Sequence, residues 1–164
     1  MSQIIADILK LIADNQDVIL SAVRLAATNK ETTMATLKIS DLSVGDWVYY
    51  DKGNTPYSIR SIYRTGIQDC VVLNDSVFPE GVICFVDRLK PIPITAEILE
   101  KNGFECIEED ADIALYGTPS CSIFHTKGTL RYRFDTPQAS VVCWFVHELQ
   151  HALRLAGVEE EINL

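Results

Sequence analysis

The sequence predicts an α+β protein with an N-terminal helical segment, a small SH3-like β-barrel, and a last module of helix, antiparallel sheet and helix. Apolar residues recur at a seven-residue interval near the start, and from Leu37 onward short β-type runs alternate with glycine turns. A hydrophobic fraction of 48% in 164 residues is enough to build a buried core. We therefore expect three parts, namely residues 1–36, 37–94 and 95–164.

The first part, residues 1–36, is expected to be a helix over residues 2–29 followed by a short polar linker. Its apolar stripe comprises Ile5, Leu9, Ile12, Ile19, Val23 and Ala26. Such a stripe needs a partner surface, which is either the rest of this chain or a second copy. Acidic and amide residues interrupt it too often for a secretory or membrane-spanning segment, so we expect a cytoplasmic protein without a membrane partner.

The barrel is predicted from four short runs rich in β-branched and aromatic residues. They are Asp46–Tyr50, Tyr57–Ile62, Cys70–Leu73 and Val82–Phe85. Strands this short cannot form a large sheet, and a closed or half-closed small barrel removes their exposed edges. Residues 86–93 would then supply a one-turn helix and a last short strand.

The last module is expected to begin with a short helix capped by Thr95 and stopped at Asn102-Gly103. Four strands should follow, at Phe104–Ile107, Ala114–Tyr116, Ser122–His125 and Leu130–Phe134. A final helix is predicted from about Ala139 to Ala156, with its end at Gly157.

The sequence HELQH at residues 147–151 has the spacing of a zinc-protease helix. In such a helix His147 and His151 bind Zn²⁺ while Glu148 acts as the general base. A catalytic zinc also needs a third protein ligand, and only thirteen residues follow the motif. His125, the only other histidine, lies upstream on a predicted strand, which is not the order of these enzymes.

The rotation of this helix is a second test of the zinc hypothesis. At about 100° per residue its apolar residues form one continuous face, and both histidines point away from it. This arrangement predicts a polar stripe that faces solvent and also contains Arg154, whose positive charge disfavours a bound cation. We therefore expect no catalytic residue, no metal and no cofactor, and keep a zinc-dependent hydrolase using His147, His151 and Glu148 as the alternative.

Charge and cysteine content restrict the other function classes. The net charge is −9, and residues 93–164 alone carry five Lys or Arg against twelve Asp or Glu. This acidity does not favour a nucleic-acid partner, because it repels the phosphate backbone. Five widely spaced cysteines without a C-x-x-C pair predict reduced thiols rather than disulfides.

Aromatic residues on the predicted barrel form the candidate binding site. Alternation along the first strand directs Trp47 and Tyr49 outward, and Tyr57 and Arg60 are close in the strand plan. These four residues are the expected partner-binding patch. In the competing interpretation, Trp47 and Tyr49 instead pack against the C-terminal module or the N-terminal helix.

Three motifs resemble a known family. They are LSVGDWVYY at residues 42–50, LKPIPIT at 89–95 with NGF at 102–104, and VHELQ at 146–150. In this order they resemble small uncharacterised proteins encoded in Bacteroidetes genomes, prophages and mobile elements. The resemblance implies the fold and the cytoplasmic compartment but no activity. In that family the last motif is similar to VHQLQN, with glutamine at the position of Glu148 and asparagine at that of His151, so zinc chemistry is not implied.

The function expected from these observations is that of a non-enzymatic accessory or protein-interaction protein. Its partner is either another protein or a second copy that associates through the N-terminal helix.

Self-association through residues 4–26 can be tested by deletion. A chain that starts at Met34 lacks the apolar stripe, so it should elute as a smaller oligomer than the full chain in size-exclusion chromatography with light scattering. A shortened chain that keeps the oligomeric state of the full chain would rule out this role for the segment.

Overall fold

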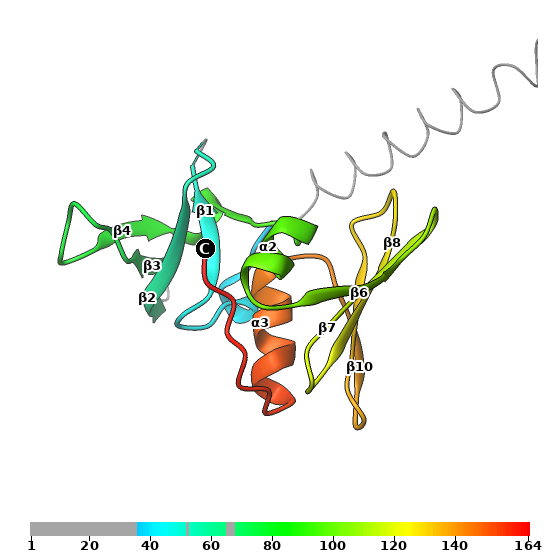
Figure 1. Ribbon diagram of the computed structural model, residues 1–164. Coiled ribbons are helices and arrows are strands. Elements are labelled where there is room, and N and C mark those ends of the chain that lie inside the picture. Colours follow the sequence, from blue (N-terminus) through cyan, green and yellow to red (C-terminus); the bar gives the residue numbers. More distant parts are fainter. Residues whose placement is uncertain (1–35, 52, 65–67) are drawn as a thin grey trace, which may run out of the picture. The chain divides into compact units, whose positions relative to one another are not determined.

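The computed structural model describes residues 36–51, 53–64 and 68–164 (Figure 1). The predicted N-terminal helix and linker lie outside these residues, and so does the segment expected to self-associate. Residues 35–164 form one compact unit. Its two described helices have six and ten residues and are too short to cross a membrane.

The described residues form an α+β fold that is mostly β, with two five-stranded antiparallel sheets and two short helices. The first sheet has the order β4-β3-β2-β1-β5. Its strands are β1 (Trp47–Tyr50), β2 (Pro56–Arg64), β3 (Asp69–Leu73), β4 (Val82–Phe85) and β5 (Leu89–Pro91). The four predicted runs and the one-turn helix η2 (Val86–Arg88) are thus confirmed.

The expected closure into a barrel is wrong, because β4 and β5 do not pair with each other among the described residues. η2 occupies the whole connection between them, and β5 continues beside β1 at the opposite edge. β5 has only three residues, and Pro91 has no N–H group for a further ladder. Side chains complete this core instead, including Leu37, Ile39 and Val86.

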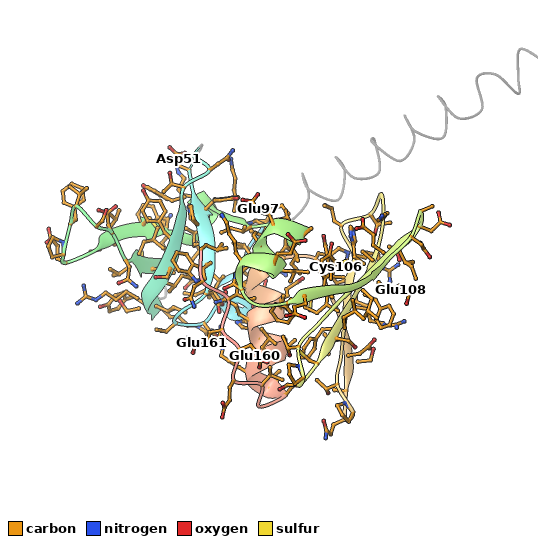
Figure 2. All side chains as sticks on the ribbon, in the orientation of Figure 1. Asp51, Glu97, Cys106, Glu108, Glu160 and Glu161 are labelled. Carbon is orange, nitrogen blue, oxygen red and sulfur yellow. The ribbon has the colours of Figure 1, made fainter. Side chains whose placement is uncertain are left out.

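The second sheet is a meander with the order β10-β9-β8-β7-β6. Its strands are β6 (Glu105–Glu109), β7 (Ile113–Gly117), β8 (Ser122–Thr126), β9 (Tyr132–Asp135) and β10 (Ser140–Cys143). It follows helix α2 (Ala96–Lys101), whose N-cap is Thr95 as predicted: the Thr95 hydroxyl accepts a hydrogen bond from the Ile98 amide. The edge strand β6 is exposed along its length, and Figure 2 labels Cys106 and Glu108 on it.

The final helix α3 (Val146–Leu155) is shorter than predicted. Residues 140–143 form β10, which pairs with β9, so the predicted helix start near Ala139 is wrong. The segment contains two consecutive valines, and β-branched side chains fit a pleated sheet better than a helix. The end of the helix at Gly157, which has a φ of +67°, is as predicted.

α3 packs between the two sheets and is tied to the segment that joins them (Figure 1). The amide of Val146 donates to the Ile92 carbonyl at 2.8 Å, and the amide of Ile94 donates to the Trp144 carbonyl at 3.3 Å. The apolar side of the helix enters the larger core, which also contains Phe104, Ile123 and Phe134. The helix therefore belongs to the core of the second sheet while its other side is free to meet the first.

Candidate functional site

The glutamate of the HELQH sequence caps its own helix. Glu148 Oε2 accepts hydrogen bonds from the amides of Trp144 at 2.7 Å and Phe145 at 3.1 Å. Amides at a helix start have no partner within the helix, and a carboxylate there also interacts favourably with the helix dipole. The Glu148 carboxylate is therefore occupied by backbone N–H groups and does not face a substrate position.

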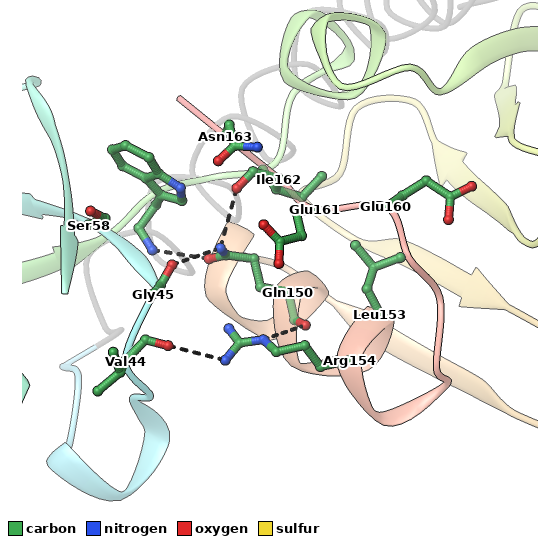
Figure 3. A pocket seen from close by; sticks show the side chains of 11 residues that line it. Val44, Gly45, Ser58, Gln150, Leu153, Arg154, Glu160, Glu161, Ile162 and Asn163 are labelled. Carbon is green, nitrogen blue, oxygen red and sulfur yellow. Dashed lines mark hydrogen bonds between the residues drawn. The ribbon is translucent and has the colours of Figure 1, made fainter. Parts of the chain in front are cut away.

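Gln150 connects α3 to the first sheet and to the C-terminal tail (Figure 3). Its Oε1 accepts from the amide of Trp47 at 3.0 Å, and its Nε2 donates to the carbonyls of Gly45 at 3.1 Å and Ile162 at 3.4 Å. The side chain is buried, so an unsatisfied amide group would be costly there. One side-chain amide thus holds together segments that lie more than a hundred residues apart.

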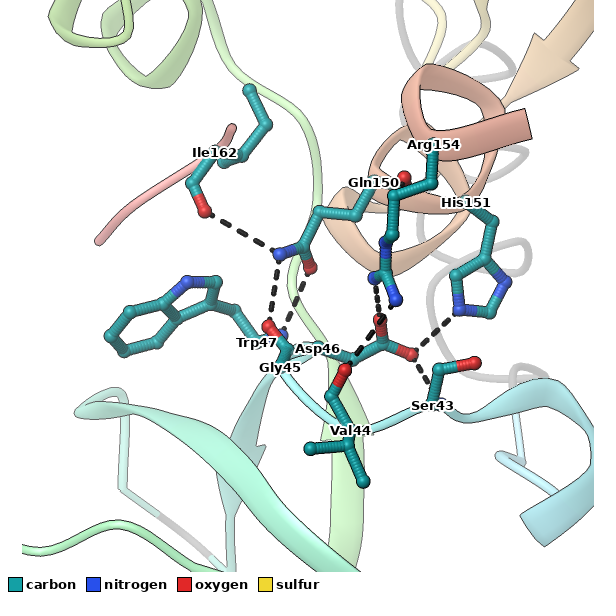
Figure 4. A network of polar contacts seen from close by, with 9 residues as sticks. All are labelled: Ser43, Val44, Gly45, Asp46, Trp47, Gln150, His151, Arg154 and Ile162. Atoms are coloured by element: carbon teal, nitrogen blue, oxygen red, sulfur yellow. Dashed lines mark hydrogen bonds and ion pairs between the residues drawn. The ribbon is translucent and has the colours of Figure 1, made fainter. Parts of the chain in front are cut away.

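The carboxylate of Asp46 contacts two further polar side chains of α3, those of His151 and Arg154 (Figure 4). This carboxylate is 0% exposed. Oδ2 accepts from the Ser43 amide at 2.7 Å and lies 2.8 Å from Nε2 of His151, and Oδ1 forms an ion pair with Nη2 of Arg154. Because a carboxylate only accepts, Nε2 of His151 carries the proton in this contact.

The guanidinium of Arg154 also contacts the segment around Asp46. Its Nε donates to the carbonyl of Gln150 at 3.1 Å and its Nη1 to the carbonyl of Val44 at 3.4 Å, in addition to the ion pair with Asp46. We refer to Asp46, Gln150, His151 and Arg154 as the docking cluster. The predicted solvent-facing polar stripe is therefore wrong, because the loop before β1 covers it and supplies its partners.

His147, the other candidate zinc ligand, is 3% exposed. Its ring stacks on Phe145 with centroids 6.0 Å apart and lies nearly perpendicular to that of His151, at 6.1 Å. Its Nδ1 is buried and has no hydrogen-bond partner among the described residues. Burial lowers the pKa of His147 and outweighs the carboxylates of Glu148 and Asp46, which act in the opposite direction.

The zinc-hydrolase alternative finds little support in these contacts. The Glu148 carboxylate accepts hydrogen bonds from backbone amides, and the His151 ring contacts the Asp46 carboxylate. The positive charge of Arg154 lies on the same Asp46 carboxylate, next to His151. In the part of the chain that the structure describes, three or more His, Cys, Asp or Glu side chains never come together in a way that could hold a metal ion. His125 is engaged elsewhere: it stacks on Tyr132 with centroids 4.1 Å apart.

The four residues of the predicted binding patch do not share one surface. Trp47 and Tyr49 are half-buried and pack against the larger core, as the competing interpretation proposed. Tyr57 packs on the core of the first sheet, edge-on to Tyr50. Arg60 is exposed, and its Nη1 donates to the carbonyl of Pro79 at 2.7 Å.

A different set of apolar side chains is exposed on β2 and β4 and in the loop before β4. Tyr63 is 53%, Ile83 72% and Phe85 45% exposed, and Val77 and Phe78 lie in the loop. We refer to these five as the outer apolar face. Sequence reasoning placed Tyr63 near the predicted binding patch but missed Ile83 and Phe85, because every residue of β4 is apolar and its composition does not distinguish the buried from the exposed side.

Comparisons of this chain with protein-family models, with curated proteins and with solved structures find no match.

We expect loss of the Asp46 charge to weaken the docking of α3. In Asp46→Asn the Arg154 guanidinium loses its carboxylate and His151 loses a charged acceptor, so the free energy of unfolding should fall by about 2–4 kcal/mol in urea denaturation. The matched control is Asp51→Asn, which breaks an exposed ion pair to Arg88 and should cost less than about 1 kcal/mol. Equal losses in the two variants would contradict the assigned role of Asp46.

The buried ring of His147 predicts that stability depends on pH. Because the folded pKa is below the ordinary value of 6.5, the unfolded chain binds a proton more readily than the folded one as the pH falls. The stabilisation by the neutral ring is thus complete above the unfolded pKa and is lost below it, with a slope of at most about 1.4 kcal/mol per pH unit.

This pH dependence can be measured by urea denaturation at a series of pH values between neutrality and the range where carboxylates titrate. His147→Phe keeps a stacked ring that cannot ionise, so its stability should fall less over the same range. A variant whose stability falls as steeply as that of the wild-type chain would show that another group is responsible.

Proposed function

We propose that this chain is a non-enzymatic protein-interaction module whose partner binds the outer apolar face. The observation that carries the proposal is that the large apolar side chains of Tyr63, Ile83 and Phe85 are exposed on one face of the first sheet. Contiguous exposed apolar surface on a folded protein commonly marks a site of association. Catalysis is not part of the proposal, because the side chains of Glu148, Gln150 and His151 in the HELQH segment are engaged in hydrogen bonds that hold α3.

The strand register supports a single continuous surface. Tyr63 pairs with Cys70, which pairs with Phe85, so these three side chains lie on the same face of the sheet. Ile83 is two residues from Phe85 on β4 and therefore points to the same side. Val72, the cross-strand partner of Ile83, lies beneath this surface and is 6% exposed.

The edge of β4 indicates how the partner would bind. β6 carries three glutamates and β5 a lysine and a proline, and such residues protect edges from pairing. β4, with the sequence Val-Ile-Cys-Phe, has no such protection. We infer that an extended segment of the partner adds to β4 as a further strand and covers Ile83 and Phe85 with its own apolar side chains.

Net charge favours a different protein over a second copy as the partner at β4. At −9 the chain repels another copy at long range, whereas a neutral or basic partner meets no such barrier. Self-association through residues 4–26 stays a separate prediction. The first sheet, with its meander, one-turn helix and return of β5 to β1, supports classifying it as an open SH3-like arrangement, a kind of domain that often binds peptides.

The resemblance to small Bacteroidetes and prophage proteins supports an accessory role in such a genome, and the five free cysteines suit a reducing cytoplasm. Both remain part of the proposal.

The proposal predicts that charges on the outer apolar face abolish partner binding without unfolding the chain. Ile83→Lys/Phe85→Lys changes two exposed side chains, so its urea denaturation midpoint should stay close to that of the wild-type chain. Photo-crosslinking from position 63 in native host cells should give a specific adduct that this double variant loses. Amide hydrogen exchange at Val82–Phe85 should slow when the crosslinked partner is purified and added, because an added strand protects the edge.

The matched control is Ile107→Lys/Val141→Lys, which introduces the same charge at exposed positions of the second sheet. It should keep the adduct at full yield. Equal yields from both double variants would overturn the assignment of this face, and unchanged exchange at β4 would overturn strand addition.

A further inference from the structure

A cavity of about 260 Å³ lies where the first sheet, α3 and the C-terminal tail meet (Figure 3). Trp47 and Ser58 line it from the first sheet, Arg154 from the helix, and Glu160 and Glu161 from the tail. Pockets for drug-sized ligands measure about 300–1,000 Å³. This one is smaller, so its size suits a single side chain better than a whole small molecule.

The tail that carries the two glutamates is fixed on both sides of them. Before them, the amide of Val158 donates to the Leu153 carbonyl at 3.0 Å. After them, Ile162 is buried with its carbonyl bonded to Gln150, and the amide of Asn163 donates to Oδ1 of Asn102 at 2.8 Å. The backbone of the tail is therefore held beside the cavity before any ligand arrives, which lowers the entropic cost of binding.

The charge balance of the cavity is negative. Arg154 lines it, but its Nε, Nη1 and Nη2 atoms already contact Gln150, Val44 and Asp46. Glu160 and Glu161 enter no ion pair with another described residue. The Glu161 carboxylate thus points toward the cavity without a cation among the described residues to balance it, whereas the Glu160 carboxylate points away from it (Figure 3).

Trp47 adds an aromatic wall to this cavity. Its backbone amide is bound by Gln150 and its side chain is half-buried against the larger core, so the indole is held in place. An indole beside the carboxylate of Glu161 favours a cation, which gains from the ring quadrupole and from the opposite charge together.

We propose that this cavity binds one cationic side chain of a partner protein, with arginine preferred over lysine. The planar guanidinium can stack on an indole while two of its N–H groups donate to the one carboxylate of Glu161, which an ammonium group cannot match. The site is separate from the outer apolar face and does not depend on the function proposed for that face.

The test uses the full chain labelled with ¹⁵N and titrated with N-acetyl-argininamide at low salt. The indole N–H signal of Trp47 should shift in a saturable way, while that of Trp144, the second tryptophan, serves as the internal reference. N-acetyl-citrullinamide, which has nearly the same shape but no charge, should leave both signals in place. N-acetyl-lysinamide should bind more weakly than the arginine compound.

Two matched variants locate the charge. Glu161→Gln should weaken binding of the arginine compound about threefold or more, as for loss of a partly exposed ion pair. Glu159→Gln removes the same charge from the same tail at a position that does not line the cavity, and it should leave binding unchanged. Equal effects of the two variants, equal binding of citrulline and arginine, or a stationary Trp47 signal would each overturn the proposal.

Discussion

The structure depends on a single carboxylate that is withdrawn from solvent. Burial of the Asp46 carboxylate without partners would cost several kcal/mol of stability. Donors from two parts of the chain offset this cost. The Ser43 amide lies in the same loop, whereas His151 and Arg154 come from a helix more than a hundred residues later. Because these donors are on α3, the loop before β1 cannot take this conformation unless the helix has docked. Folding of the first sheet is thereby coupled to that of the second.

Both faces of α3 contact other parts of the chain, and these contacts explain how a ten-residue helix can be stable. A helix this short is marginal in water by itself. Val146, Leu149 and Leu153 enter the core of the second sheet, while Gln150 and His151 meet the loop of the first. The spacing of three and four residues that lets a zinc protease place two histidines on one face here places hydrogen-bonding groups toward a protein surface. The same motif can therefore serve architecture instead of metal chemistry.

The surfaces with functional potential are those that this architecture leaves uncovered. Docking against α3 partly covers Trp47 and Tyr49, so the exposed large apolar side chains of the described first sheet are those of β2 and β4 instead. The C-terminal tail, anchored by Gln150 and Asn102, closes a small acidic cavity beside Trp47. Recognition of an apolar segment and of a cationic group would then use different faces of one compact unit.

Local pattern alone was enough to predict the period-two strands of the first sheet, the Thr95 cap and the helix end at Gly157, because each follows from the conformational preference of a few consecutive residues. It failed where neighbours distant in sequence decide. Closure of the barrel depended on whether β4 pairs with β5. The exposed fraction of His147 depended on whether another segment of the chain covers its side chain. Sequence by itself therefore determined both described helices, the amphipathic character of α3 and most of the strands, whereas it assigned the residues of β10 to the last helix. Only the tertiary structure decided which polar residues are buried, because their hydrogen-bond partners lie more than a hundred positions away.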